Sequence, residues 1–140
     1  MAITQAMCNS FKTELLGGTH DLDTDVIKIA LYTSSATLDA STTAYSTTNE
    51  VTGSTGYTAG GNTLSGAAIS LSGSTAIVDF SDTTWTSSTI TARGALIYNS
   101  SKSNKAIAVL DFSSDKSSTN GDFTIVFPAA NASNAIIRIA

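Results

Sequence analysis

The chain has 140 residues, a length that fits one domain and is short for two. Only 13% of the residues are charged, and 11 acidic against 7 basic side chains give a net charge of −4. That balance argues against a surface that binds nucleic acid by neutralising phosphates. The single cysteine, Cys8, excludes an internal disulfide and a zinc site with several thiolates.

Small hydroxyl side chains dominate the composition, with 22 Thr and 21 Ser among the 140 residues. Threonine suits the pleated surface of a sheet, and serine competes for local backbone hydrogen bonds in turns. No apolar run is long enough to span a membrane, and the first residues lack the basic and apolar regions of a signal peptide. We therefore expect a mainly β protein that is made in the cytoplasm and contacts no membrane.

The first part of the chain is the best helix candidate, over residues 3–16 within an N-terminal segment 1–18. Thr4 would cap this helix, and the glycine pair at 17–18 would end it. Apolar side chains recur at every fourth position, which places them on one helix face: Ile3, Met7, Phe11 and Leu15.

From residue 25 onward the hydrophobic period changes to two, which is typical of strands. The first strand places Ile27, Ile29 and Leu31 on one face. Several short strands in one domain over residues 1–140 predict an antiparallel β-sandwich or a jelly-roll-like barrel with one N-terminal α-helix. The other predicted strands are 67–72, 75–80, 89–98, 106–112, 123–127 and 135–139, and turn-rich clusters lie at 72–74, 99–104, 113–121 and 129–134.

Alternation along these strands also predicts the core. A sandwich requires apolar side chains on the inner faces of both sheets. The positions that meet this condition are Ile27, Ile29, Leu31, Ile77, Phe80, Leu96, Tyr98, Val109, Phe112, Ile125, Phe127 and Ile137.

Residues 33–66 interrupt the strand pattern. This stretch spans 34 residues, consists mostly of Ser, Thr, Gly and Ala, and has only weak periodicity. A structureless loop of that length inside a compact domain is uncommon and is usually functional. We interpret it as a long irregular arm, too poor in large apolar groups to order by itself, that becomes ordered against another subunit or a partner.

A near miss to a phosphate-binding loop lies within this arm, at residues 56–63 (GYTAGGNT). Asn62 stands where such a loop needs the lysine that reaches the phosphates, and no helix pattern follows. We therefore interpret the glycines as a turn that leads into a strand.

Asp21, Asp23 and Asp25 alternate along the chain, and three such carboxylates could converge on a calcium ion. An EF-hand loop that starts at Asp21 would need Gly and Glu where this sequence has Val26 and Tyr32. A solvated turn, in which aspartates accept bonds from local amides, is the interpretation we adopt. We expect no metal ligand and no cofactor, although the sequence alone leaves a cation at these aspartates open.

No residue pattern predicts catalysis. His20, the single histidine, follows the glycine pair and is expected to be exposed in a turn. No Gly-x-Ser-x-Gly sequence marks a nucleophilic serine. Cys8 is expected to be a small buried helix residue, since Lys12 is the only basic group near it in sequence. We expect a protein that is not an enzyme and has no catalytic residues.

Several motifs together resemble a known group of proteins. They are NEVTGSTGYTAGG at residues 49–61, WTSSTITARGALIY at 85–98, and LDF at 110–112 followed by GDFTIVFP at 121–128. The opening, in which a glycine pair precedes DLDTDVIKIALY at 21–32, completes the pattern. In this order the motifs resemble the small structural proteins of tailed bacteriophages and prophages, over nearly the whole chain.

The resemblance implies a non-enzymatic virion protein. Size and acidic balance favour a capsid decoration (cement) protein, bound to the major capsid protein on the capsid surface as a homo-oligomer, with a trimer favoured. A neck, tail or baseplate component is the alternative. A host-surface glycan-binding module is a third possibility, in which Tyr45, Tyr57 and Trp85 would form a platform for sugars.

Four residues are predicted to form the assembly interface. Tyr45, Val51 and Tyr57 carry the sizeable apolar groups that would anchor the arm on a neighbour. Arg93 lies inside a predicted strand, where its long side chain must either reach solvent or find a partner. It would form an ion pair either with another subunit or within the chain, where Asp79, Asp82 and Asp111 are candidates.

Overall fold

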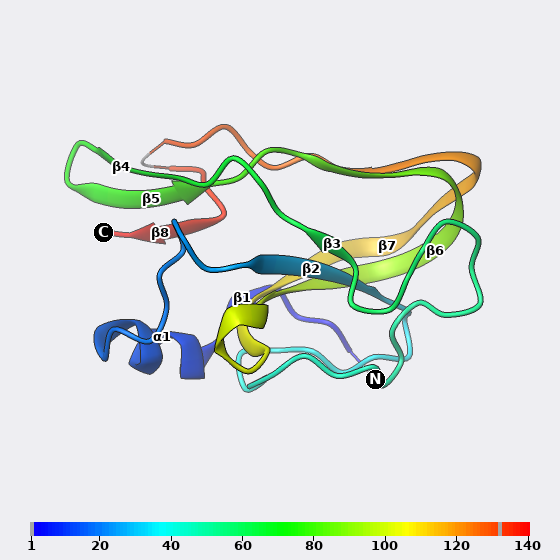
Figure 1. The fold of residues 1–140 in the computed structure, drawn as a ribbon, viewed down its shortest axis with the longest axis horizontal. Helices are drawn as coiled ribbons and strands as arrows, with labels where there is room; N and C mark the ends of the chain where they lie inside the picture. The colour runs from blue at the N-terminus through cyan, green and yellow to red at the C-terminus, as the bar shows by residue number, and fades with distance from the viewer. Residues whose placement is uncertain (1, 132) are drawn as a thin grey trace.

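Two antiparallel β-sheets and one α-helix form the computed structural model, which describes residues 2–131 and 133–140 (Figure 1). The larger sheet has the strand order β1-β7-β6-β2-β3, and the smaller sheet has the order β4-β5-β8. The expectation of a mainly β protein with one helix is confirmed. In chain order the elements are β1 (Ala6–Met7), α1 (Asn9–Leu16), β2 (Ile27–Tyr32), β3 (Asn62–Thr63), β4 (Ala68–Ser72), β5 (Thr75–Asp79), β6 (Thr83–Asn99), the 3₁₀ turn η1 (Ser100–Lys102), β7 (Lys105–Ile125) and β8 (Ile137–Ile139).

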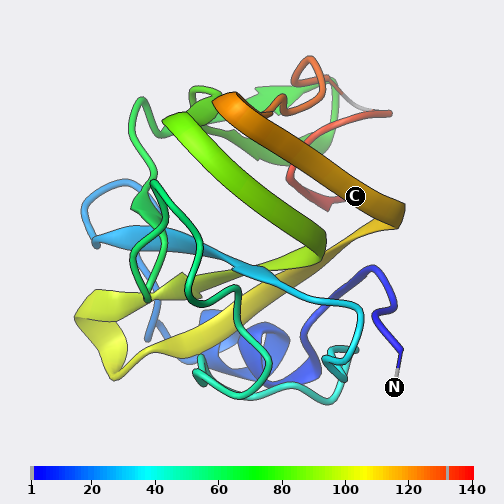
Figure 2. The same cartoon turned by 90° about the vertical axis from the view of Figure 1, so that its right-hand side faces the viewer.

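The two long strands β6 and β7 form a ribbon that bends in its middle. Ala92 lies opposite Lys116, but Gly94 lies opposite Asp111, so that residues 112–115 stand opposite Arg93 alone. Such an insertion kinks a strand and increases its twist. Figures 1 and 2 show the consequence, because one half of the ribbon turns back over the half that pairs with β2.

The ribbon corrects one prediction. Residues 113–121 were expected to form a turn between two strands, but they lie inside the single strand β7. Hydroxyl groups bond directly across the ribbon, at 3.0 Å between Thr91 and Ser117 and at 2.9 Å between Ser88 and Ser118. Cross-strand pairs of this kind stabilise a sheet, so pairing with β6 overrides the local preference of serine for turns.

The core confirms the predicted strand alternation. Of the twelve predicted core positions, eleven are buried and Phe112 is half-buried. Trp85 and Phe123 lie opposite each other on β6 and β7, in the half of the ribbon that turns back, and their rings lie edge to face with centroids 6.1 Å apart. Trp85 is only 4% exposed, so the platform for sugars that would use its ring face is wrong.

The N-terminal helix is shorter than predicted, because α1 begins at Asn9 rather than at residue 3. The preceding residues are extended: Ile3 bridges to Leu38, and β1 pairs with β7. The backbone N–H of Cys8 donates to the carbonyl of Ile107, so pairing with a distant strand takes the place of the first helical turns. The predicted end is confirmed, with Gly17 as the C-cap.

Neither sheet closes on itself within the described residues, so a closed barrel is wrong. The outer strands are β1 and β3 in the larger sheet and β4 and β8 in the smaller sheet. The α-helix of the described chain is too short to cross a membrane.

Candidate functional site

The arm at residues 33–66 lies against its own domain. Its only regular strand is the two-residue β3, which confirms its irregular character. Backbone bonds nevertheless attach it at several points: the N–H of Val51 donates to the carbonyl of Leu31, and the N–H of Tyr45 donates to the carbonyl of Asn104. Figure 2 shows the arm looping around one end of the larger sheet, between β2 and β3.

A buried carboxylate organises the middle of the arm. The Glu50 side chain accepts hydrogen bonds from the hydroxyl of Tyr45 at 2.6 Å, the hydroxyl of Tyr57 at 2.6 Å and the backbone N–H of Gly60 at 2.8 Å. Glu50 is only 3% exposed. Burial of a charge is costly unless strong donors surround it, and hydrogen bonds to an ionised group are about twice as strong as neutral ones. These bonds fold the arm around one point.

Two further tyrosines join this arrangement to the larger sheet, so all four tyrosines of the chain gather here. The hydroxyl of Tyr98 on β6 donates to the carbonyl of Gly60 at 2.6 Å, and its ring stacks on that of Tyr45 with centroids 4.6 Å apart. The hydroxyl of Tyr32 on β2 donates to the carbonyl of Ser46. We call Glu50 and the four tyrosines the Glu50 cluster.

Burial raises the pKa of every tyrosine in the Glu50 cluster. The pKa of Tyr98 rises to about 12, with a further contribution from the charge of Glu50. The pKa values of Tyr32, Tyr45 and Tyr57 rise further, mainly by burial. At neutral pH all four hydroxyls therefore remain protonated and act as donors.

The glycine turn of the near-miss phosphate loop belongs to the same cluster. The N–H of Gly60 is bonded to Glu50 and is not free to receive a phosphate. Gly61 has a φ of 76°, and a side chain there would collide with the carbonyl of Ile29. The interpretation as a turn that leads into a strand is confirmed, since β3 begins at the next residue.

The structure brings three of the four predicted assembly residues together, but it turns them inward. Tyr45 and Tyr57 bind Glu50 and pack against the core, and Val51 is only 3% exposed. Arg93 lies apart from them, where its Nε bonds to Oδ1 of Asp115 at 2.9 Å across the ribbon. An intrachain partner was one of the two alternatives for Arg93, although Asp115 was not among the candidates. The assembly role of all four residues stays a prediction.

A second polar cluster surrounds His20, which is 6% exposed, so the expected exposed histidine is wrong. Its Nε2 lies 2.9 Å from Oε1 of Glu14, and its Nδ1 lies 3.0 Å from Nδ2 of Asn99. Nδ2 of Asn99 also donates to Asp25 at 2.8 Å. Sequence reasoning missed this cluster because Asn99 lies 79 positions from His20 and reaches it only through the pairing of β2 with β6.

The His20 cluster has the pairing of an acid–base dyad but lacks a nucleophile. Both ring nitrogens are engaged, by Glu14 and by Asn99, and no serine, threonine or cysteine bonds to the ring among the interactions described. Cys8 is fully buried, and burial together with the charges of Asp39 and Glu14 raises its pKa to about 11. Its thiol therefore stays protonated and unreactive at neutral pH.

The three aspartates form a turn, as the adopted interpretation predicts. Oδ1 of Asp21 accepts from the backbone N–H groups of Asp23 and Thr24, and the N–H of Asp21 donates to Oδ2 of Asp25. The hydrogen bond from Asn99 is the main reason that the pKa of Asp25 is lowered. Within residues 2–131 and 133–140, no group of three or more His, Cys, Asp or Glu side chains is placed to hold a metal ion.

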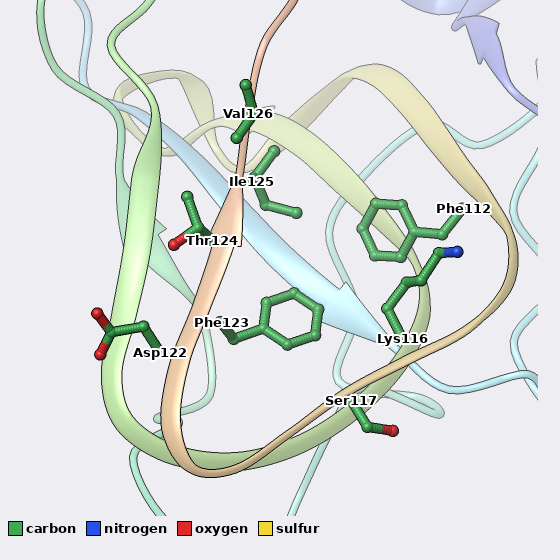
Figure 3. Close-up of a pocket in the computed structure, with 8 residues that line it drawn as sticks. All are labelled: Phe112, Lys116, Ser117, Asp122, Phe123, Thr124, Ile125 and Val126. Carbon is green, nitrogen blue, oxygen red and sulfur yellow. The ribbon is translucent and has the colours of Figure 1, made fainter.

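The bend of β7 leaves a hollow of about 470 Å³ on the open side of the ribbon (Figure 3). The rings of Phe112 and Phe123 point into the space that the bend encloses, and Lys116, Ser117 and Asp122 also belong to its lining. The hydroxyl of Ser117 bonds to that of Thr91 across the ribbon, and none of the interactions described joins it to Lys116 or Asp122, so the hollow mainly offers an apolar surface.

Comparisons with known protein families, curated proteins and solved structures give no match to this chain. The resemblance of its motifs to phage structural proteins therefore stays a prediction.

Proposed function

We propose that this chain is a non-enzymatic structural protein of a tailed-bacteriophage virion, and that it decorates the capsid surface as a cement protein. The observation that carries the proposal is the order of phage-like motifs along the chain, at residues 21–32, 49–61, 85–98 and 110–128. The polar groups of these motifs bond to one another: Glu50, Tyr57 and Tyr98 belong to one cluster.

The use of the polar side chains supports a structural role. The two buried polar clusters, around Glu50 and around His20, hold distant parts of the fold together. A rigid domain loses little conformational freedom when it is immobilised on a shell. Many copies bound at symmetry-related sites then stabilise the shell by avidity, even when each contact is weak.

The net charge of −4 fits the same role. An acidic protein does not compete for the packaged DNA, whose phosphates attract basic surfaces. The partners in this proposal are the major capsid protein and further copies of the chain, with the trimer as the favoured oligomer. No nucleic acid and no membrane is a partner.

We interpret the architecture as sandwich-like, because the bent ribbon turns back over the larger sheet and apolar side chains fill the space inside the bend. A jelly-roll connectivity stays a prediction. Sandwich-like domains serve many functions, so the fold agrees with a virion role without selecting it.

The direct test is to locate the protein on purified particles of the phage or prophage whose genome encodes it. The proposal expects density for this fold on the outer capsid surface and a copy number close to that of the major capsid protein. A small copy number set by the symmetry of the portal or baseplate would instead support the neck, tail or baseplate alternative. Absence from purified particles would overturn the virion role altogether.

A functional measurement complements the localisation. Particles assembled without this protein are expected to release their DNA at a lower temperature than complete particles, and added purified protein should restore the higher temperature. Equal release temperatures with and without the protein would contradict a cement function, even if the protein were found on the capsid.

A further inference from the structure

The smaller sheet has an uncovered apolar face at its outer strand, β4. Ile69 and Leu71 lie on one face of β4 and are 55% and 71% exposed. Their partners on β5 are Val78 and Ala76, which continue the same face. The apolar face therefore reaches the edge of the sheet, where no strand of the described chain pairs with β4 on its other side.

Natural sheets protect such edges, and β4 has none of the usual devices. Edge strands are commonly shortened, bulged, or supplied with charges or proline, because an open strand edge is a template for pairing with another chain. β4 pairs with β5 over five residues without a register shift, from Ala68 to Ser72. Its sequence, AISLS, contains no charge and no proline.

The other outer strands differ from β4 in this respect, and the side of β6 that β2 leaves open, at residues 83–93, bonds to the arm through the N–H of Thr89 and the carbonyl of Thr84. β1 and β3 are two residues long, and β8 is three residues long and carries Arg138. The open part of β7 is interrupted by the bulge at residues 112–115 and carries charged side chains there and beyond.

Charge identifies the kind of partner. Residues 51–78 contain no Asp, Glu, Lys or Arg, so β4 lies in an uncharged stretch of 28 residues within a chain of net charge −4. Two copies of an acidic protein repel each other wherever their charged surfaces meet, whereas a neutral strip avoids that cost. A strongly charged partner would find no complementary group on β4. A second copy of the chain is therefore the occupant that the charge pattern favours.

We propose that β4 pairs antiparallel with β4 of a second copy, about a two-fold axis that passes through Ser70. In this register Ile69 of each chain lies opposite Leu71 of the other, so the apolar face continues across the junction. The two smaller sheets become one sheet of six strands. A contact of this kind is self-complementary, as a two-fold interface requires.

The groove beside β4 adds apolar area next to the junction. A groove of about 360 Å³ lies between the smaller sheet and the segment that follows α1, lined by Leu15, Leu22, Ile69, Val78 and Ile139 among others. Ile69 is common to this groove and to the exposed edge. Pairing at β4 therefore places the Leu71 side chain of the second copy beside a surface that is already apolar.

The first experiment compares two lysine substitutions in the purified protein. The wild-type chain is expected to form dimers in sedimentation equilibrium. Leu71→Lys should raise the dimer dissociation constant by at least about tenfold, because two ammonium groups then enter the apolar junction. Leu16→Lys is the matched control, since Leu16 is 92% exposed on α1 and outside the proposed contact. Circular dichroism checks that both variants are folded.

The second experiment tests the register by cross-linking. Ser70→Cys should give a disulfide-linked dimer on oxidation, because residues opposite each other on antiparallel strands lie within disulfide range. Ser72→Cys is the control: its two copies would lie about 14 Å apart, four residues along the strand. The native Cys8 is fully buried and does not compete.

Three results would overturn the inference: a monomeric or trimeric wild-type protein, equal weakening by both lysine variants, or cross-linking through Ser72→Cys in preference to Ser70→Cys. The inference does not depend on the proposed virion role, but it replaces the trimer named there with a two-fold dimer, and sedimentation of the protein alone in solution decides between the two. A dimer would stand even if the chain were absent from purified particles.

Discussion

The two sheets of this protein complete their surfaces in different ways. The larger sheet is partly covered by the chain's own arm, which the Glu50 cluster attaches to β2 and β6. The smaller sheet has no such cover over β4, where Ile69 and Leu71 are exposed. On the larger sheet, hydrogen bonds to a buried carboxylate thus hold a cover that has few apolar side chains. On the smaller sheet, apolar side chains of β4 have no covering segment.

The comparison shows that a segment poor in large apolar residues can still pack on its own domain. The arm buries Val51 and Leu64 and directs its tyrosine hydroxyls to Glu50. Hydrogen bonds to an ionised group contribute more than ordinary ones, which helps to offset the cost of ordering the backbone. That the arm becomes fully ordered only on a partner stays a prediction.

Among the changes considered, alkaline pH is expected to lower the free energy of unfolding the most. It acts through the tyrosines of the Glu50 cluster. The raised tyrosine pKa values mean that the folded state holds the phenolic protons more tightly than the unfolded state does. Their stabilisation is complete below the unfolded pKa of about 10. It is lost as pH rises toward the folded values, at up to about 1.4 kcal/mol per tyrosine for each pH unit.

Tyrosinate absorbance and circular dichroism, followed together against pH, test this expectation. Both should change in one cooperative transition well above pH 10, because ionisation of the tyrosines requires unfolding. Gradual ionisation near pH 10 with an unchanged dichroism spectrum would mean that the tyrosines are accessible and that the Glu50 cluster is loose.

Phe11→Ala should be the most damaging single substitution of those considered. Phe11 is fully buried between α1 and the larger sheet and contacts the His20 ring. Its truncation is expected to cost about 3–5 kcal/mol in the free energy of unfolding, measured by urea denaturation. Leu16→Ala on the same helix should change it by less than about 0.5 kcal/mol. A loss below about 1 kcal/mol for Phe11→Ala would show that α1 contributes little to the isolated fold.

Glu50→Gln tests whether the carboxylate holds the arm. The glutamine amide places N–H donors among three groups that are themselves donors. The free energy of unfolding is therefore expected to fall by about 1.5–3 kcal/mol. The substitution should increase the rate of amide hydrogen exchange more in residues 33–61 than in β4 and β5. Asp122→Asn removes the same charge from an exposed position and serves as the control. Unchanged exchange in the arm would show that other contacts attach it.

Arg93→Ala should change the free energy of unfolding the least. The Arg93 and Asp115 side chains are 37% and 48% exposed, and an exposed ion pair contributes about 0–1 kcal/mol. The oligomeric mass should stay the same, because the ion pair lies within one chain. A change in mass on sedimentation would instead restore the alternative of an ion pair between subunits.

Much of the fold could be predicted from periodicity. The alternation of Ile27, Ile29 and Leu31 locates β2, and the short apolar runs that follow locate β4 and β5 within a residue of their observed bounds. These patterns depend only on neighbouring residues, since a strand with a buried face must alternate. The end of α1 at the glycine pair is local in the same way.

Tertiary structure decided the features that depend on distant pairing. Residues 3–7 have helical spacing, but Ile3 bridges to Leu38 in the arm, and Ala6 and Met7 pair with β7. The serines at 113–118 favour a turn locally, but hydrogen bonds from hydroxyl groups of β6 stabilise this segment as part of the strand β7. His20 and Asn99 meet only because β2 pairs with β6.

By itself, then, the sequence determined the β class, the core positions and the absence of charge along β4, because each is a property of composition or of short-range spacing. Only the tertiary structure decided that the tyrosines surround Glu50 and that Ile69 and Leu71 remain uncovered. The physical reason is the same in both cases. Burial and hydrogen-bond partners are set by which segments meet, and that depends on the packing of the whole chain.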